Sequence, residues 1–171
     1  VSVTLGATAA AENLYKDGYM YVNDAVGEGQ IFRVKSHLAI ASAGSGFIEL
    51  YEDTPVRVAL TTASEVTLIR NPYAQVIIHP SPPVSRAVGV TMVDVAANYY
   101  CWLQTWGPAP VLADGTLVIN DSVMASDAVD GAVEDYILTE GTPNTEITPI
   151  IGDCIAVNAD TEQALIHLRI D

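Results

Sequence analysis

The sequence predicts an all-β protein, an antiparallel sandwich or barrel-like subdomains built from hairpins, with very little helix. Valine, isoleucine and threonine supply 48 of the 171 residues, and β-branched side chains fit a pleated, half-buried surface. A pattern also occurs twice. Residues 88–97 (VGVTMVDVAA) run into 99–103 (YYCWL), and residues 151–160 (IGDCIAVNAD) run into 164–168 (ALIHL). In both copies a glycine follows a β-branched residue, an alanine lies seven positions later, and a polar break precedes a β-rich strand. We interpret this pattern as a repeated β-hairpin.

The N-terminal part of the chain predicts an arm followed by short strands. Residues 1–11 (VSVTLGATAAA) are small and uncharged and have no periodicity, so we expect an extended arm that a partner orders and whose removal leaves the folded body intact. A helical tendency at 7–15 is too short to stand alone. Residues 12–79 predict an N-terminal β subdomain. Its strands are expected at 19–22, 31–35, 47–51, 66–69 and 75–78, separated by turn residues.

A proline cluster at residues 79–83 (HPSPP) predicts a boundary, because proline fixes φ and cannot donate to a strand ladder. Residues 80–86 are therefore expected to connect two subdomains. Residues 87–171 predict a C-terminal acidic β subdomain that contains the repeated hairpin. Its other predicted features are a break at Gly107-Pro108, strands near 111–112, 123–124, 133 and 136–137, an exposed loop at 139–149, and a final strand that buries Ile166, Leu168 and Ile170 on one face.

The charge distribution excludes some partners. The formal net charge is −14, which predicts repulsion from nucleic acid and from anionic membrane surfaces. Residues 1–86 carry eight acids and six bases, whereas residues 87–171 carry thirteen acids and a single base, Arg169. Either the acidic half is a solubilising exterior, or the near-neutral half docks on a partner while the acidic half faces solvent. No apolar run approaches the roughly 20 residues of a membrane helix, and no export signal is recognisable, so we expect a soluble protein that is not exported.

The sequence offers no catalytic, cofactor or metal signature. There is no G-x-S-x-G motif, and Gly44-Ser45-Gly46 is better explained as a loop. His37, His79 and His167 lack metal-ligand spacing, and no phosphate-binding glycine loop opens a helix. Two cysteines without an export signal, Cys101 and Cys154, predict buried free thiols, with a disulfide left open. Five acids could form a calcium site or a solvated rim, and we expect the rim: Asp121, Asp127, Asp130, Glu134 and Asp135.

An aromatic group near the first copy of the repeat has three interpretations. It could be a platform that stacks on carbohydrate, it could present one face to the core, or it could anchor a contact between subunits, where tryptophan and tyrosine are enriched. We place the candidate interface in this group and in the N-terminal arm. The candidate interface residues are Val1, Val3, Leu5, Tyr99, Tyr100, Trp102 and Trp106.

The chain resembles small structural proteins of tailed phages in several segments. These are residues 29–37 (GQIFRVKSH), 68–73 (LIRNPY) and 88–108 (VGVTMVDVAANYYCWLQTWGP), followed by ADGT and a closing IGDC. The second half is similar to capsid decoration (cement) proteins, and the resemblance covers about residues 19–171. It implies a non-enzymatic virion protein, made in the host cytoplasm, that sits on the outer capsid surface, binds the major capsid protein and forms a homotrimer. The alternatives are a phage fibre or head-surface adhesin for host carbohydrate, a small trimeric β hydrolase, and a bacterial structural protein.

Overall fold

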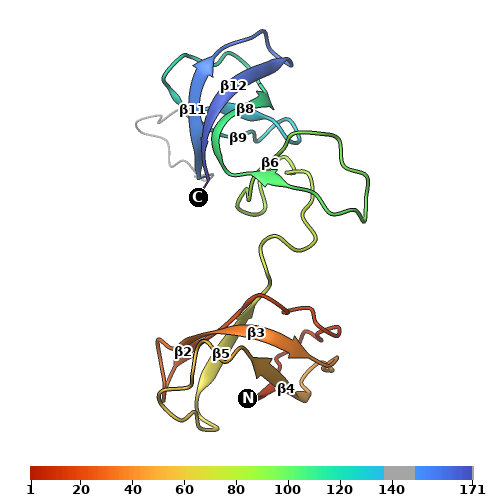
Figure 1. Ribbon diagram of the computed structural model, residues 1–171, viewed down its shortest axis with the longest axis vertical. Helices are drawn as coiled ribbons and strands as arrows, with labels where there is room; N and C mark the ends of the chain where they lie inside the picture. Colours follow the sequence, from red (N-terminus) through yellow and green to blue (C-terminus); the bar gives the residue numbers. More distant parts are fainter. Residues whose placement is uncertain (137–148, 171) are drawn as a thin grey trace. The chain divides into compact units, whose positions relative to one another are not determined.

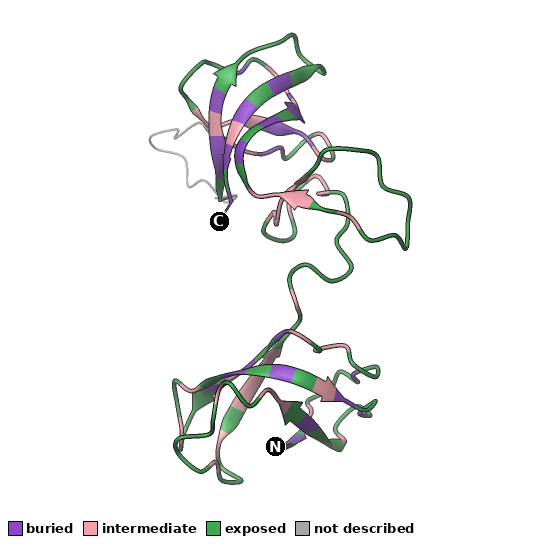
Figure 2. Cartoon of the chain, viewed as in Figure 1, coloured by how far each residue is buried: buried purple, intermediate pink, exposed green. Residues whose placement is uncertain are grey.

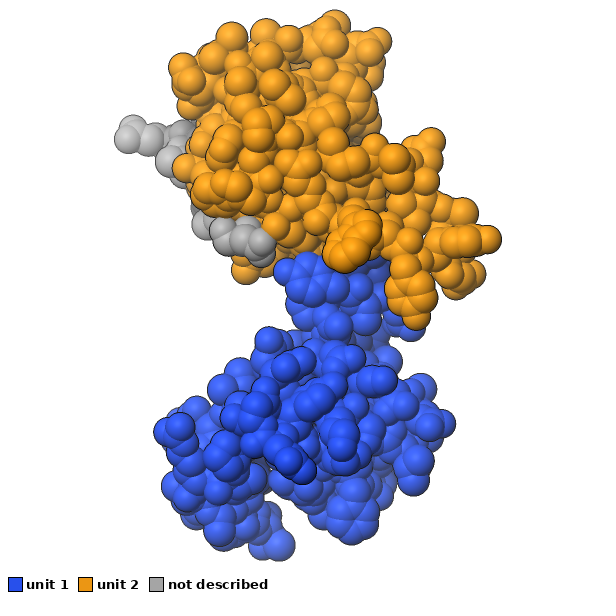
Figure 3. All heavy atoms as spheres, in the orientation of Figure 1, with its two compact units in different colours: residues 1–76 blue, residues 77–171 orange. Residues whose placement is uncertain are grey.

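Twelve strands and no helix make up the part of the chain that the structure describes, residues 1–136 and 149–170 of a computed structural model. All pairings between strands are antiparallel, in two five-stranded sheets and one two-stranded sheet (Figure 1). The sheets remain open, and the architecture is consistent with a β-sandwich. The all-β fold class predicted from the sequence is confirmed. The chain divides into two compact units, residues 1–76 and 77–171 (Figure 3).

The first unit is built on one five-stranded sheet in the order β1-β4-β3-β2-β5. One face of this sheet is buried because alternate side chains of the strands are apolar. Met20, Phe32, Val34 and Ile48 are at most 2% exposed, and loop residues pack over them. The strands are β1 (Ser2–Thr4), β2 (Tyr19–Asp24), β3 (Ile31–His37), β4 (Ser45–Leu50) and β5 (Glu65–Ile69).

The expectation of a free N-terminal arm is wrong. Ser2–Thr4 form β1, which pairs with β4, and Val3 is buried in the core of the first unit. The backbone N–H of Leu5 donates to the carbonyl of Gly44 at 3.0 Å, and Ala10 forms a bridge with Ile40. Alternation over three residues is too short to be seen in the sequence, and only the partner strand reveals the role of Val3. Residues 1–10 belong to the folded body.

The second unit contains the other five-stranded sheet, in the order β10-β9-β11-β12-β8. Its core includes Val123, Ile151 and Cys154. On β12, Ile166 and Leu168 have no exposed surface and Ile170 follows at 8%, so the predicted one-sided terminal strand is confirmed. The strands are β8 (Trp106–Leu112), β9 (Ser122–Ala125), β10 (Val133–Asp135), β11 (Ile150–Ala156) and β12 (Gln163–Arg169). Two further strands, β6 (Val90–Thr91) and β7 (Leu103–Gln104), pair only with each other.

Several local predictions are corrected. Residues 75–78 form no strand and lie exposed. Gly107-Pro108 does not break the chain but lies inside β8. Proline is tolerated there because β8 is an edge strand, and the exposed Pro108 and Pro110 remove N–H donors that a foreign strand could use. Of the predicted strand 136–137, Tyr136 lies in no strand. Residue 137 and nearly all of the predicted loop 139–149 lie outside the described residues.

The proline-rich segment belongs to the second unit rather than connecting two subdomains. The unit boundary falls between residues 76 and 77. The backbone N–H of Gly131 donates to the carbonyl of His79 at 2.9 Å, and Arg86 donates to the carbonyl of Ile170 at 2.8 Å. These long-range hydrogen bonds hold residues 79–86 against the second unit. The proline content of the segment does not predict such bonds.

Candidate functional site

The two copies of the repeated pattern share one structural device, a glycine that allows two strands to approach closely. A Cβ atom added at Gly89 would lie 2.7 Å from Cβ of Leu103, and one added at Gly152 would overlap the carbonyl oxygen of His167. In each case the neighbour belongs to the second strand of the same copy. The glycine that follows the β-branched residue is therefore explained by strand pairing, as the hairpin interpretation requires.

The two copies nevertheless end in different structures. In the second copy β11 and β12 form a long hairpin with neighbours on both sides, β9 and β8. In the first copy only two residue pairs form, Val90 with Gln104 and Thr91 with Leu103. No further strand flanks this ladder among the described residues, and the predicted strand 99–103 is a strand only at Leu103. The intervening residues 92–102, which we call the aromatic loop, extend away from the sheet (Figure 1).

The aromatic loop is apolar and exposed. Tyr100 and Trp102 are fully exposed, with relative exposures of 105% and 95%, and Tyr99 follows at 76%. Met92 and Val93 are also more than half exposed. Figure 2 shows this excursion almost entirely in the colour of exposed residues. Side chains of this size normally lie in a core or an interface, because each buries a large apolar area.

The loop also folds over a hollow of its own. Residues 92–96 and 99–104 line an open hollow of about 640 Å³. The hollow is open to solvent, and its walls include the exposed side chains of Tyr99, Tyr100 and Trp102. These aromatic side chains therefore both reach into solvent and border the open space.

Charge is sparse in this segment of the chain. Residues 87–113 carry a single charged side chain, Asp94. The cores of protein interfaces are depleted in charged residues and enriched in aromatic ones and methionine. This depletion is visible in the sequence and points to Met92, Val93 and Val95, which the repeated pattern marks only as hairpin residues.

Not all candidate interface residues lie on this surface. Trp106 lies on β8, is 58% exposed and contacts His167 edge to face, with ring centroids 5.5 Å apart. The side chain of Gln104 links β7 to β8 by donating to the carbonyls of Trp106 and Pro108 at 3.0 and 2.9 Å. The arm residues belong to the other unit.

The three arm residues are held by the first unit itself. Val3 is buried and Leu5 is partly buried against the same core, while the N-terminal amine of Val1 donates to the carbonyl of Ile48 at 2.8 Å. These side chains do not form a free arm. The aromatic loop is the candidate site that remains.

A serine, a histidine and an aspartate come together at one place, but without the geometry of a nucleophile and its base. The backbone N–H and hydroxyl of Ser81 both donate to Asp130, at 2.8 and 2.7 Å. These bonds hold the pKa of Asp130 below its ordinary value, and His79 adds a smaller effect in the same direction. Both ring nitrogens of His79 are buried and have no hydrogen-bond partner among the described residues. The Ser81 hydroxyl therefore faces a carboxylate rather than an imidazole.

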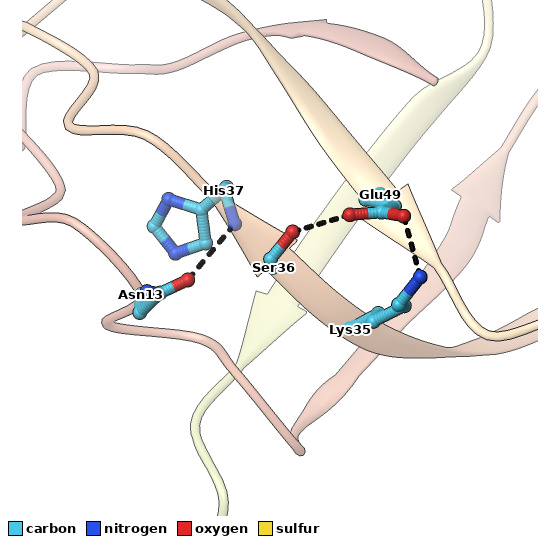
Figure 4. Close-up of polar contacts among 5 residues, drawn as sticks. All are labelled: Asn13, Lys35, Ser36, His37 and Glu49. Atoms are coloured by element: carbon cyan, nitrogen blue, oxygen red, sulfur yellow. Dashed lines mark hydrogen bonds and ion pairs between the residues drawn. The ribbon is translucent and has the colours of Figure 1, made fainter.

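His37 supports the fold of the first unit through its hydrogen bonds (Figure 4). Its Nε2 accepts from the backbone N–H of Tyr15 at 3.0 Å, and its Nδ1 lies 2.8 Å from the carbonyl of Leu38. The backbone N–H of His37 donates to Asn13 at 3.2 Å. The ring is 4% exposed, so these bonds fasten residues 13–15 to β3.

Next to His37, a carboxylate joins two strands. Glu49 on β4 accepts from Lys35 and Ser36 of β3 at 2.7 and 2.6 Å (Figure 4). These hydrogen bonds lower the pKa of Glu49 and raise that of Lys35. The ion pair is solvent-exposed, and such pairs contribute little stability. This cluster supports the sheet and offers no free reactive group.

The thiols and acids form no recognisable centre. Both cysteines are free. Cys154 is buried, which raises the pKa of its thiol, whereas Cys101 is only partly buried, contrary to the prediction. Within residues 1–136 and 149–170, no group of three or more histidine, cysteine or acidic side chains is placed to hold a metal ion. Over the same residues, no helix is long and apolar enough to cross a membrane.

Comparisons with known proteins identify no relative. No protein-family model matches the chain, no curated protein is similar to it at a significant level, and no solved structure matches its fold significantly.

Proposed function

We propose that this protein is a non-enzymatic structural protein of a tailed-phage virion that decorates and reinforces the capsid as a cement protein, as a homotrimer bound to the major capsid protein on the outer surface. The observation that carries the proposal is the aromatic loop. The chain places its largest side chains in solvent, on a surface almost without charge, where they can serve assembly. The capsid as the place of assembly follows from the resemblance in residues 19–171.

The distribution of surface charge supports an assembly protein in a further way. Outside residues 87–113, the C-terminal half is strongly acidic, which keeps the unassembled protein soluble. Binding at several capsid sites through one symmetric oligomer raises the overall affinity, because each contact after the first is intramolecular. Symmetric oligomers also match the repeated sites of a closed shell.

Localisation on virus particles tests this proposal. Antibodies against the purified protein should label the heads of the intact tailed-phage particles that encode it. Heads stripped of the protein should break at a lower temperature than complete heads, and adding the purified protein should restore the difference. Particles without the protein, or stripped heads that are as stable as complete ones, would overturn the proposal.

A second function is supported by the same aromatic side chains. Tyr99, Tyr100 and Trp102 could stack on sugar rings above the hollow, as in a fibre or head-surface adhesin that binds host carbohydrate. Glycan binding by the purified protein, lost in the Trp102→Ser variant, together with antibody labelling of fibres instead of heads, would favour this function.

A further inference from the structure

The aromatic loop exposes large apolar side chains that also border an open hollow. Tyr100 and Trp102 project into solvent, and residues 92–96 and 99–104 of the same segment line the hollow. We propose that the loop is the contact through which copies of this chain associate, with an aromatic side chain of one copy entering the hollow of the next. This inference deepens the proposed function by naming the surface between copies, and it rests on that function only for the number of copies.

The exposed area of the loop covers much of what a specific contact needs. An aromatic side chain buries roughly 150–250 Å², so the three aromatic residues together offer on the order of 500 Å². The exposed parts of Met92, Val93 and Val95 extend this surface. A standard interface buries about 800 Å² on each partner. The loop and its surroundings approach that area without help from other elements.

Charge limits where two copies of this chain can meet. Two copies, each with a net charge of −14, repel each other wherever their acidic surfaces meet. They meet at lower cost where charge is sparse, and residues 87–113, whose single charged side chain Asp94 lines the hollow, are such a segment. A basic partner would instead be attracted to the acidic remainder of the second unit. The charge pattern therefore favours self-association at the loop.

The proposed contact is head to tail: an aromatic side chain of one copy enters the hollow that Tyr100 and Trp102 themselves help to line in the next copy. Such heterologous contacts form a closed ring when the rotation between copies allows closure. A ring of three copies would provide the homotrimer of the proposed function. Tyr100 and Trp102 would then be hot spots, since tryptophan and tyrosine that fill a pocket dominate binding energies.

The test is the solution mass of the full-length protein, measured by light scattering over a range of concentrations. We expect an oligomer for the wild type. The double variant Tyr100→Ser/Trp102→Ser should be monomeric at concentrations about 100-fold above the wild-type midpoint. Its melting temperature under monomeric conditions should equal that of the wild type, because both side chains lie in solvent.

A matched control removes exposed apolar side chains elsewhere. Phe47 and Leu38 are 79% and 75% exposed in the first unit, so Phe47→Ser/Leu38→Ser should leave the oligomer intact. A monomeric wild type, or a loop variant with the same mass as the wild type, would overturn the inference. Failure of the capsid function would appear separately, as an oligomeric protein that is absent from virions.

Discussion

Truncation of one buried valine tests whether the N-terminus is part of the fold. Val3 is 7% exposed and packs in the core of the first unit, so Val3→Ala removes two buried methyl-sized groups. At about 0.8 kcal/mol for each, the free energy of unfolding should fall by about 1.5 kcal/mol. In a unit of 76 residues this corresponds to a decrease in melting temperature of about 6–12 °C.

Calorimetry can assign this loss to one unit. Each unit has its own hydrophobic core, so we expect two unfolding transitions. Val3→Ala should lower only the transition of the first unit, whereas Ile166→Val, in the core of the second unit, should lower only the other by about 0.5–1.5 kcal/mol.

Ser2→Ala is the matched control on the same strand, because Ser2 points outward. Its effect should stay within about 0.5 kcal/mol. If Val3→Ala leaves both transitions unchanged, then β1 is not docked and residues 1–11 form the free arm that the sequence suggested. An equal loss of stability in Ser2→Ala would refute burial of the Val3 side chain as the cause.

Three further predictions concern the second unit. Gly152→Ala forces a Cβ atom against the backbone of β12 and should lower the free energy of unfolding in denaturant by about 1–3 kcal/mol. A Cβ atom at Gly6 meets no neighbour, so Gly6→Ala should show no such loss. Equal losses in the two variants would contradict the explanation. Cys154 is 1% exposed and its thiol has a raised pKa, so a maleimide should not label it in the native protein. After denaturation the maleimide should label both Cys154 and Cys101. Equal labelling of the two cysteines in the native protein would refute the prediction. The pKa of Asp130 lies below its ordinary value of 3.8. The ionised carboxylate therefore stabilises the fold above pH 3.8, and this contribution is lost as the pH falls further. The difference in melting temperature between wild type and Asp130→Asn should shrink below pH 3.8, and a difference that stays constant with pH would contradict this prediction.

The aromatic loop could be only partly predicted. The sequence marks Tyr99, Tyr100 and Trp102 as candidate contact residues, and the lack of charge in residues 87–113 points to the same region. It does not reveal that these side chains leave the sheet. The same pattern forms a hairpin inside the five-stranded sheet in residues 151–168, so the pattern alone does not distinguish the two outcomes.

By itself the sequence determined the all-β class, four strands of the first unit and the buried face of β12, because β-branched composition, turn residues and two-residue alternation act locally. Only the tertiary structure decided that Val3 joins a sheet, that residues 79–86 belong to the second unit, and that the first copy of the repeat stays open. The physical reason is that a strand is stabilised by its neighbours. β11 and β12 are flanked by β9 and β8, whereas β6 and β7 pair only with each other, which leaves the aromatic loop in solvent.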